Sequence, residues 1–311
     1  MVDAWFFIIN PVSGGGKGIK KWPKLKRVLI NNNIEFKEFF TIGNGDATKL
    51  AIECISNGAE KICVVGGDGT LNEVVNGVLQ QKHKPSEEIL ISMFAVGTGN
   101  DWVKTMKIPT NTKAFVNTLK DPQYIFQDSG KISFQKDGVQ TERYFANIAS
   151  IGFAGIVTKK ANLSLKGGKI SYILALLKSL RAYRSSRLKI TFNDIYIYEN
   201  IYNVSVCICK YAGGGMKFGP AANPGDGLFD LTVIKDLPAM EVVRNILFLF
   251  SGSFIKHPKV NTYRTEKLSI ESKENVLIET DGEFIGNLNA EISIVKQALK
   301  VTCYNEFNDE G

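Results

Sequence analysis

The sequence has little of what disulfide-stabilised or zinc-binding proteins need. Among its 311 residues there are five cysteines and two histidines. An odd number of cysteines cannot pair completely, and Cys207 and Cys209 are separated by one residue, which is not the spacing of a zinc site. We therefore expect buried free thiols in a reducing compartment, without a metal–thiolate centre.

Long hydrophobic runs and a leader segment are also missing. No stretch reaches the roughly 18 uninterrupted apolar residues that a membrane-spanning helix needs. The segment 1–10 lacks a basic start, and Asn10–Pro11 ends its apolar run too early for a signal peptide. These absences predict a cytoplasmic protein.

The composition itself is that of a globular chain. It is 44% hydrophobic and 22% charged, and its length allows two domains with a substantial core. The formal net charge of +7 favours anionic ligands or an anionic membrane surface. No recognition motif for nucleic acid accompanies this charge, so we expect no nucleic-acid partner.

The first third of the chain alternates between strand and helix patterns. Repeated strand–helix units of this size predict a parallel sheet covered by helices. The expected strands are Ala4–Asn10, Ile34–Thr41, Lys61–Val65 and Ile89–Ala95. The expected helices are Ile19–Asn33, Ala47–Asn57, Leu71–Leu79 and a short one from Asn100.

Beyond about Asp128 strand patterns dominate, which predicts a mostly antiparallel sandwich or barrel. We expect strands at Ser129–Phe134, Tyr144–Ile151, Leu188–Phe192, Tyr196–Tyr198, Tyr202–Cys209, Leu228–Ile234, Lys267–Ser272, Val276–Thr280 and Ala290–Val295. Helices are expected near Gly168–Ser185 and Met240–Phe250. The predicted domains are 1–127 and 128–297.

The strongest motif is VVGGDGTLNEVVNG, Val64 to Gly77, which follows a strand and opens a helix. Glycines at 66, 67 and 69 let backbone N–H groups approach phosphate oxygens, and the helix start adds a partial positive charge. Asp68 can hold a cation or position a nucleotide, and Thr70 can donate to phosphate. The alternative, a plain glycine turn, suits a much shorter motif better.

This motif resembles the catalytic domain of the diacylglycerol kinase family, which includes bacterial soluble lipid kinases and the sphingosine and ceramide kinases. Further ordered matches are NPVSGGGKG, TIGNGDATKLA, AVGTGNDWVK, NPGDGLFDL and TDGE, which begin at Asn10, Thr41, Ala95, Asn223 and Thr280. The resemblance implies an α/β nucleotide-binding domain like that of NAD kinases and phosphofructokinases, followed by a β-sandwich. It also implies that residues 298–311 return to the first domain.

By this resemblance the first domain binds ATP. The implied ATP-site residues are Asn10, Pro11, Val12, Ser13, Gly14, Thr41, Gly66, Gly67, Asp68, Gly69, Thr70, Leu71, Asn72 and Thr98. Phosphoryl transfer needs charge neutralisation, so we expect Mg²⁺, with Asp68 and Asp101 as its nearest carboxylates. Lys17 is either a countercharge for phosphate or a solvated loop lysine. The alternative for Asp101 is that it only caps the helix that begins near Trp102. Glu73 and Asn76 either contact the nucleotide or serve in helix capping and solvation.

A lipid hydroxyl needs a proton acceptor before it can attack phosphorus. In TDGE, Asp281 and Glu283 are two residues apart, so an extended backbone would turn both carboxylates to one side. The resemblance implies that Glu283 takes the proton and that Asp281 is its partner. The alternative is an Asp-Gly hairpin turn.

A second cation site is implied in the sandwich. The resemblance assigns to it the Asp226 carboxylate and backbone oxygens of Asn223 and Leu228, in a structural or regulatory role. A plain Gly-Asp-Gly turn is the alternative.

The expected activity is ATP-dependent phosphorylation of a lipid hydroxyl, with diacylglycerol converted to phosphatidic acid, as in phospholipid biosynthesis. Other lipids, long-chain bases, NAD and a non-catalytic nucleotide-binding regulator remain alternatives. The stretch Lys159–Arg187 either contacts anionic membrane transiently or is a core helix with a basic outer side. Phe248–Phe254 either lines an acyl pocket or fills the core. Oligomeric state is open between a monomer and a homodimer.

Overall fold

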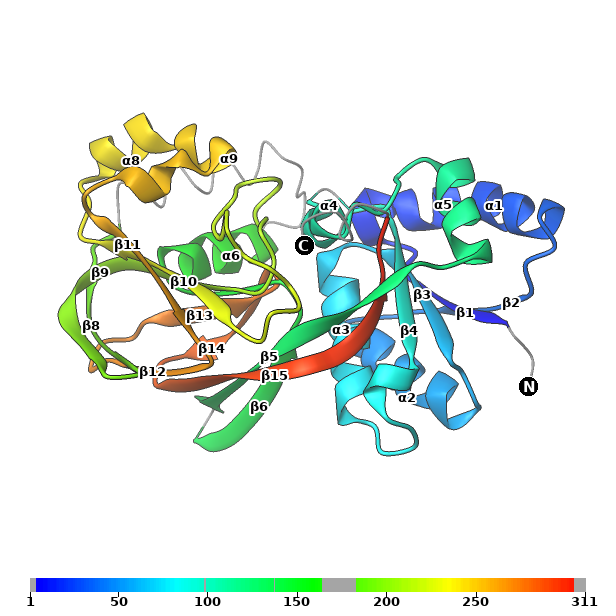
Figure 1. Cartoon of the computed structure of the whole chain (residues 1–311), viewed down its shortest axis with the longest axis horizontal. Coiled ribbons are helices and arrows are strands. Elements are labelled where there is room, and N and C mark those ends of the chain that lie inside the picture. Colours follow the sequence, from blue (N-terminus) through cyan, green and yellow to red (C-terminus); the bar gives the residue numbers. More distant parts are fainter. Residues whose placement is uncertain (1–3, 98, 137, 164–182, 305–311) are drawn as a thin grey trace. The chain divides into compact units, whose positions relative to one another are not determined.

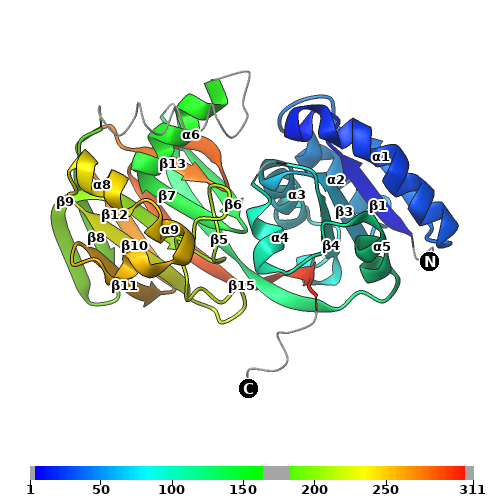
Figure 2. The same ribbon diagram turned by 90° about the horizontal axis from the view of Figure 1, so that it is seen from above.

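The computed structural model describes residues 4–97, 99–136, 138–163 and 183–304, which form two compact units. Unit 1 comprises residues 1–128 and 296–311, and unit 2 comprises residues 129–295. The chain passes between the units twice, once within β5 (Tyr124–Lys136) and once within β15 (Ala290–Thr302). Figures 1 and 2 show the elements of each unit in two views.

Unit 1 is an α/β structure built on a parallel sheet in the order β2–β1–β3–β4–β15. Its strands are β1 (Trp5–Ile9), β2 (Phe36–Phe40), β3 (Lys61–Gly66), β4 (Leu90–Ala95) and the end of β15. Its helices are α1 (Ser13–Asn31), α2 (Asp46–Ser56), α3 (Asp68–Gln80), the 3-10 turn η1 (Ser86–Glu88), α4 (Asp101–Thr105) and α5 (Thr112–Lys120). β1 and β4 are buried along their whole length, as expected for strands covered on both faces.

Two buried tryptophans fix the outer elements of unit 1. Trp5 Nε1 donates to the Leu119 carbonyl at 3.2 Å and so ties β1 to the end of α5. Trp102 Nε1 donates to Gln127 Oε1 at 2.9 Å, which ties α4 to β5. The returning end of β15 pairs with β4 in parallel, with Lys300 opposite Leu90.

Unit 2 is a mostly antiparallel β-sandwich with helices on it. Its strands, besides β5 and β15, are β6 (Val139–Phe145), β7 (Ile148–Gly152), β8 (Ser186–Phe192), β9 (Ile195–Cys207), β10 (Phe229–Lys235), β11 (Val260–Thr265), β12 (Lys267–Glu271), β13 (Leu277–Thr280) and β14 (Glu283–Asn287). The helical segments are α6 (Phe153–Leu163), α8 (Ala239–Asn245), α9 (Phe248–Ser251) and the 3-10 turn η2 (Ser253–Lys256). β9 is central and pairs antiparallel with β7, β8 and β10.

The fold class predicted from the sequence is confirmed, but several boundaries differ. The expected strand Tyr144–Ile151 is divided into β6 and β7, and the two strands expected between Tyr196 and Cys209 are one strand, β9. The helix expected at Met240–Phe250 is divided into α8 and α9. Most of the helix expected at Gly168–Ser185 lies outside the described residues. Among the described helices, none is long and apolar enough to cross a bilayer.

Candidate active site

Three loops follow neighbouring parallel strands of unit 1. They are residues 10–16, between β1 and the regular part of α1, residues 66–70, at the junction of β3 and α3, and residues 96–97 and 99–100, after β4. Backbone hydrogen bonds connect them: Asn10 N donates to Val65 O at 2.9 Å, and Val96 N donates to Gly66 O at 2.8 Å. The carboxyl edge of a parallel sheet is the usual ligand-binding edge of α/β proteins.

The first loop requires glycine because its backbone is left-handed at three consecutive positions. Gly14, Gly15 and Gly16 have φ values of +62°, +71° and +83°. A Cβ on Gly14 would lie 2.1 Å from the Val96 carbonyl oxygen, so this backbone packs directly against the third loop. Nothing lies within 4 Å of a Cβ on Gly15 or Gly16, which leaves open space beside this part of the loop.

The second loop is held between the other two. Thr70 Oγ1 accepts a hydrogen bond from Asn10 Nδ2 at 3.0 Å. A Cβ on Gly97 would lie 2.9 Å from the Gly67 Cα atom, so these two backbones are also in contact. Helix α3 begins directly after Gly67, which gives the junction the partial positive charge of a helix N-terminus.

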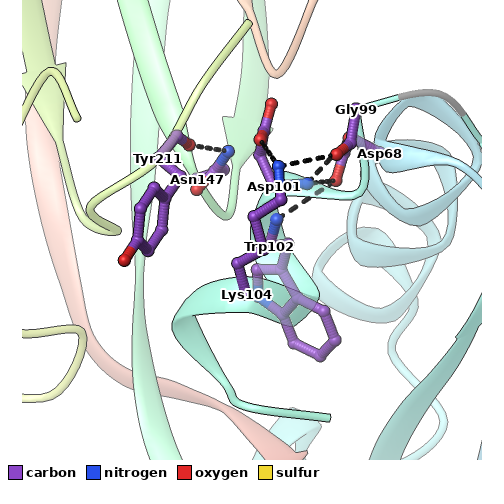
Figure 3. Close-up of polar contacts among 7 residues, drawn as sticks. All are labelled: Asp68, Gly99, Asp101, Trp102, Lys104, Asn147 and Tyr211. Atoms are coloured by element: carbon purple, nitrogen blue, oxygen red, sulfur yellow. Dashed lines mark hydrogen bonds and ion pairs between the residues drawn. The ribbon is translucent and has the colours of Figure 1, made fainter. Parts of the chain in front are cut away.

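Asp68 links this junction to α4. Its carboxylate accepts the backbone N–H of Asp101 at 3.0 Å and that of Trp102 at 3.2 Å, as the dashed lines in Figure 3 show. Asp68 therefore stabilises the N-terminus of α4 from another element. The sequence predicts that Asp68 holds a cation or positions a nucleotide. The two N–H contacts are compatible with that role but do not demonstrate it.

The carboxylates of Asp68 and Asp101 approach the same glycine. A Cβ on Gly99 would lie 3.0 Å from Asp68 Oδ2 and 3.2 Å from Asp101 Oδ2. The Lys104 ammonium donates to Asp101 Oδ1 at 2.7 Å and to the Gly99 carbonyl at 2.9 Å (Figure 3). Two acidic side chains and one ammonium group, from the start of α3 and from α4, thus surround Gly99 of the third loop. Sequence reasoning did not single out Lys104.

The remaining residues of the implied ATP site differ in how far their side chains are buried. Thr41, Leu71 and Asn72 are buried, so their side chains lie in the interior of unit 1. Val12 is exposed, and Ser13 Oγ lies 3.5 Å from the position of a Cβ on Gly67. Thr98 lies outside the described residues.

Two residues of α3 have structural partners. The Glu73 carboxylate accepts the backbone N–H groups of Gly45 at 2.8 Å and Ala47 at 3.0 Å, so it caps α2. Asn76 Nδ2 donates to the Asn72 carbonyl one turn earlier. Lys17 is exposed on α1 beside Gly14.

In unit 2 the TDGE segment is a tight turn between β13 and β14. Asp281 and Gly282 have φ values of +50° and +83°, so the expected extended backbone was wrong and the hairpin alternative holds. The Asp281 carboxylate is buried and accepts the N–H groups of Ala146 at 2.9 Å, Asn147 at 2.9 Å and Ile148 at 3.0 Å. These contacts explain why the chain breaks between β6 and β7.

Asn147 adds a further contact at this break. Its Nδ2 donates to the Tyr211 carbonyl at 2.8 Å, as drawn in Figure 3. Its Oδ1 is buried without a hydrogen-bond partner. An unsatisfied buried acceptor is unusual in a native fold, so the segment beside the DGE turn offers one acceptor for a ligand or a water molecule.

Sequence reasoning missed Glu279, a third carboxyl group on the same hairpin. Glu279 is buried, and its Oε2 accepts the Gly282 N–H at 2.9 Å. Burial raises its pKa to about 7, although hydrogen bonds from Ser150 and Gly282 oppose the rise. Glu283, at the start of β14, is half-buried. The sequence does contain a signal for this third carboxyl group, because acidic residues alternate at positions 279, 281 and 283.

The implied second cation site contains a positively charged side chain. Arg264 on β11 pairs with the Asp226 carboxylate and lies 3.7 Å from Asp230 Oδ2. Asp226 Oδ1 also accepts the Leu228 N–H at 3.1 Å, and Asn223 Oδ1 accepts the Gly225 N–H at 3.3 Å. The Arg264 guanidinium thus already places a positive charge beside Asp226. A cation bound by Asn223, Asp226 and Leu228 stays a prediction.

Unit 2 also contains an apolar cavity. The cavity has a volume of about 100 Å³ and lies among α6, β9, β10, α8, α9 and η2. Phe153, Val157 and Tyr202 form one wall, and Ile246 and Leu249 form another. The segment from Phe248 to Phe254 contributes Leu249 and Phe254, so it lines this cavity in part.

Comparison with known proteins connects these features to a family. Residues 4–132 match the diacylglycerol kinase catalytic domain, and residues 147–303 match the YegS C-terminal NAD kinase beta sandwich-like domain. The putative lipid kinase YtlR of Bacillus subtilis is 28% identical, with 96% of this chain and 98% of that protein covered. A diacylglycerol kinase of Staphylococcus saprophyticus is 25% identical, with 97% and 96% covered.

Solved structures show the same fold. A crystal structure of a putative diacylglycerol kinase from Bacillus anthracis has a TM-score of 0.76 at 23% identity, with 97% of each chain covered. Yeast NADH kinase complexed with NADH has a TM-score of 0.53 at 10% identity, with 98% of this chain and 85% of that chain covered.

Proposed function

The chain belongs to the diacylglycerol kinase family, and from this premise we propose that it is an ATP-dependent lipid kinase that converts diacylglycerol to phosphatidic acid. The main support is the arrangement of the three loops of unit 1. Their glycine-rich backbones meet at the carboxyl edge of a parallel sheet, beside the N-terminus of α3. Such an arrangement suits the polyphosphate of a nucleotide.

Unit 1 would hold ATP through residues 10–16, 66–70, 96–97 and 99–100. The exposed Lys17 and the Lys104 ammonium are near enough to these loops to offset phosphate charge. Asp68 and Asp101 fit Mg²⁺ because both carboxylates approach Gly99, and Mg²⁺ uses few protein carboxylates together with phosphate oxygens and waters. Among the described residues, no group of three or more acidic, histidine or cysteine side chains is placed to hold a metal ion by itself. Bound Mg²⁺ would neutralise charge on the phosphates.

Unit 2 would supply the acceptor side of the reaction. The lipid hydroxyl oxygen attacks the γ-phosphorus, the bond from that phosphorus to the β–γ bridging oxygen breaks, and ADP leaves. Glu283 takes the hydroxyl proton. Asp281 acts as a positioning residue, because its three N–H contacts hold the turn that carries Glu283.

The acyl chains of the substrate would occupy the cavity lined by Phe153, Tyr202 and Leu249. A lining of this kind favours hydrocarbon and offers little to the polar groups of NAD. This feature favours a lipid acceptor over NAD, although NADH kinase shares the fold. We also propose transient contact with anionic membrane, since the substrate lies in a bilayer and the chain carries a net charge of +7.

A substrate panel tests this proposal. The purified chain is incubated with Mg²⁺, ATP labelled on its γ-phosphate, and diacylglycerol, sphingosine or NAD in separate reactions. We expect label in phosphatidic acid. Label in sphingosine alone would identify sphingosine instead of diacylglycerol as the lipid substrate. Label in NAD alone would show that the chain is not a lipid kinase. ATP binding without transfer to any acceptor would instead support a non-catalytic regulator.

A further inference from the structure

The segment formed by α8 and α9 is apolar on more than one side. Val242, Ile246 and Leu249 line the cavity of unit 2. The outer face consists of Met240, Val243, Leu247, Phe248 and Phe250, which are 64%, 44%, 75%, 50% and 49% exposed. A surface helix normally buries one apolar face and presents polar residues on the other side, so a second, exposed apolar side needs an explanation.

This grouping differs from the other exposed apolar side chains of unit 2. Those, including Val139, Ile195 and Tyr196, lie on strands, and single exposed apolar residues of this kind are common. The outer face instead gathers five large side chains between positions 240 and 250. Figure 1 shows α8 and α9 in gold on the side of unit 2 away from β12. A contiguous exposed apolar face indicates an interaction surface.

The charges around the outer face favour a membrane that contains acidic lipids. Arg244 on α8 and Lys256 on η2 are exposed, and the described residues include no ion-pair partner for either. The acidic residue of the segment, Glu241, is paired with His257 at 2.9 Å and with Lys259 at 3.7 Å. The segment therefore presents apolar side chains flanked by basic ones, which is the pattern of interfacial helices.

The cavity behind the helices gives a reason to prefer a bilayer over a second protein chain. The same short segment carries the outer face and one wall of an apolar cavity. A lipid tail that leaves a bilayer at this segment could reach the cavity while remaining in contact with apolar side chains. A protein partner bound to the outer face would have no need of the apolar cavity behind it.

We propose that the outer face of α8 and α9 inserts into the surface of a bilayer that contains acidic lipids and brings the cavity to its substrate. The use of the cavity rests on the proposed lipid kinase function, whereas insertion itself does not. Side chains of this type at the interface stabilise binding through the apolar area that they bury.

Vesicle flotation of the full chain tests the insertion. Wild type should float with phosphatidylcholine vesicles that contain phosphatidylglycerol, and less with phosphatidylcholine alone. Leu247→Ser/Phe248→Ser/Phe250→Ser should weaken vesicle binding about tenfold or more. The matched control, Val139→Ser/Ile195→Ser/Tyr196→Ser, removes exposed apolar side chains elsewhere in unit 2 and should bind like wild type.

Fluorescence supplies a second readout that does not depend on catalysis. Leu247→Trp should show a blue-shifted emission on adding the acidic vesicles, and brominated lipids should quench it. Equal vesicle binding by wild type and the Leu247/Phe248/Phe250 variant, or no change in Trp emission, would overturn the proposal. A wild-type dimer that this variant converts to a monomer, without vesicle binding, would also overturn it by identifying an interface between copies. A chain that binds vesicles through this face but phosphorylates no lipid would refute the kinase proposal alone.

Discussion

Glu279, Asp281 and Glu283 alternate along one hairpin but have different surroundings. Asp281 is buried against three backbone N–H groups, Glu279 is buried against Gly282 and Ser150, and Glu283 is half-buried on β14. The sequence shows their spacing but not the partners of Asp281, which are 133 to 135 residues away. Spacing alone therefore predicts two carboxylates that face the same side, whereas the structure gives them separate environments.

Glu279 should make stability depend on pH. Its pKa is raised from 4.5 to about 7 in the folded chain, so the folded state holds this proton more tightly than the unfolded state. The resulting stabilisation is complete below about pH 4.5 and is lost as the pH rises toward 7. A shift of this size corresponds to about 3 kcal/mol.

Glu279→Gln should remove this dependence, because the amide stays neutral and can still accept the Gly282 N–H. Urea unfolding of wild type and variant at pH 5 and pH 8 measures the effect. The free energy of unfolding of wild type, relative to the variant, should fall between the two pH values by about 2 kcal/mol, because part of the stabilisation is already lost at pH 5. A difference that stays the same at both pH values would show that Glu279 does not titrate as described.

At the scale of elements, the loop after β1 depends on close backbone contact. Gly14→Ala places a Cβ 2.1 Å from the Val96 carbonyl and also strains a left-handed residue. Backbone must shift to relieve this contact, so the free energy of unfolding should fall by about 3 kcal/mol or more. Thermal or urea denaturation measures the loss.

Gly16→Ala is the matched control for that substitution. Gly16 has the same left-handed backbone, with φ of +83°, but nothing lies within 4 Å of an added Cβ. Only the conformational cost applies, about 1 kcal/mol. Equal losses for the two variants would contradict the contact between the first and third loops.

The elements that sequence patterns predicted well are those with a strong period or a long apolar run. Strands β1, β3 and β4 are continuous buried runs, and each is followed by a glycine loop. Short or half-exposed elements were missed, among them α5, β11 and β14. The sequence patterns predict two strands where the structure has one, β9, because the stretch around Glu199 and Asn200 is polar and exposed.

At the scale of the whole molecule, each unit carries one half of the proposed chemistry. Unit 1 has the three loops with Asp68 and Asp101, and unit 2 has the DGE turn and the apolar cavity. The family could be recognised from ordered motifs, and both matched domain models together span residues 4–303 except for a short segment between them. The pairing of Asp226 with Arg264 could not be foreseen, since the two lie 38 positions apart.

The most direct test of the account separates nucleotide binding from phosphoryl transfer in Glu283→Gln. Glu291→Gln, an exposed carboxylate of β15 in the same unit, serves as the control. With labelled ATP and diacylglycerol vesicles, Glu283→Gln should transfer phosphate about 100-fold more slowly or worse, while its ATP affinity and the rate of the control stay near wild type. A wild-type transfer rate in Glu283→Gln would contradict the proposal that unit 2 supplies the proton acceptor.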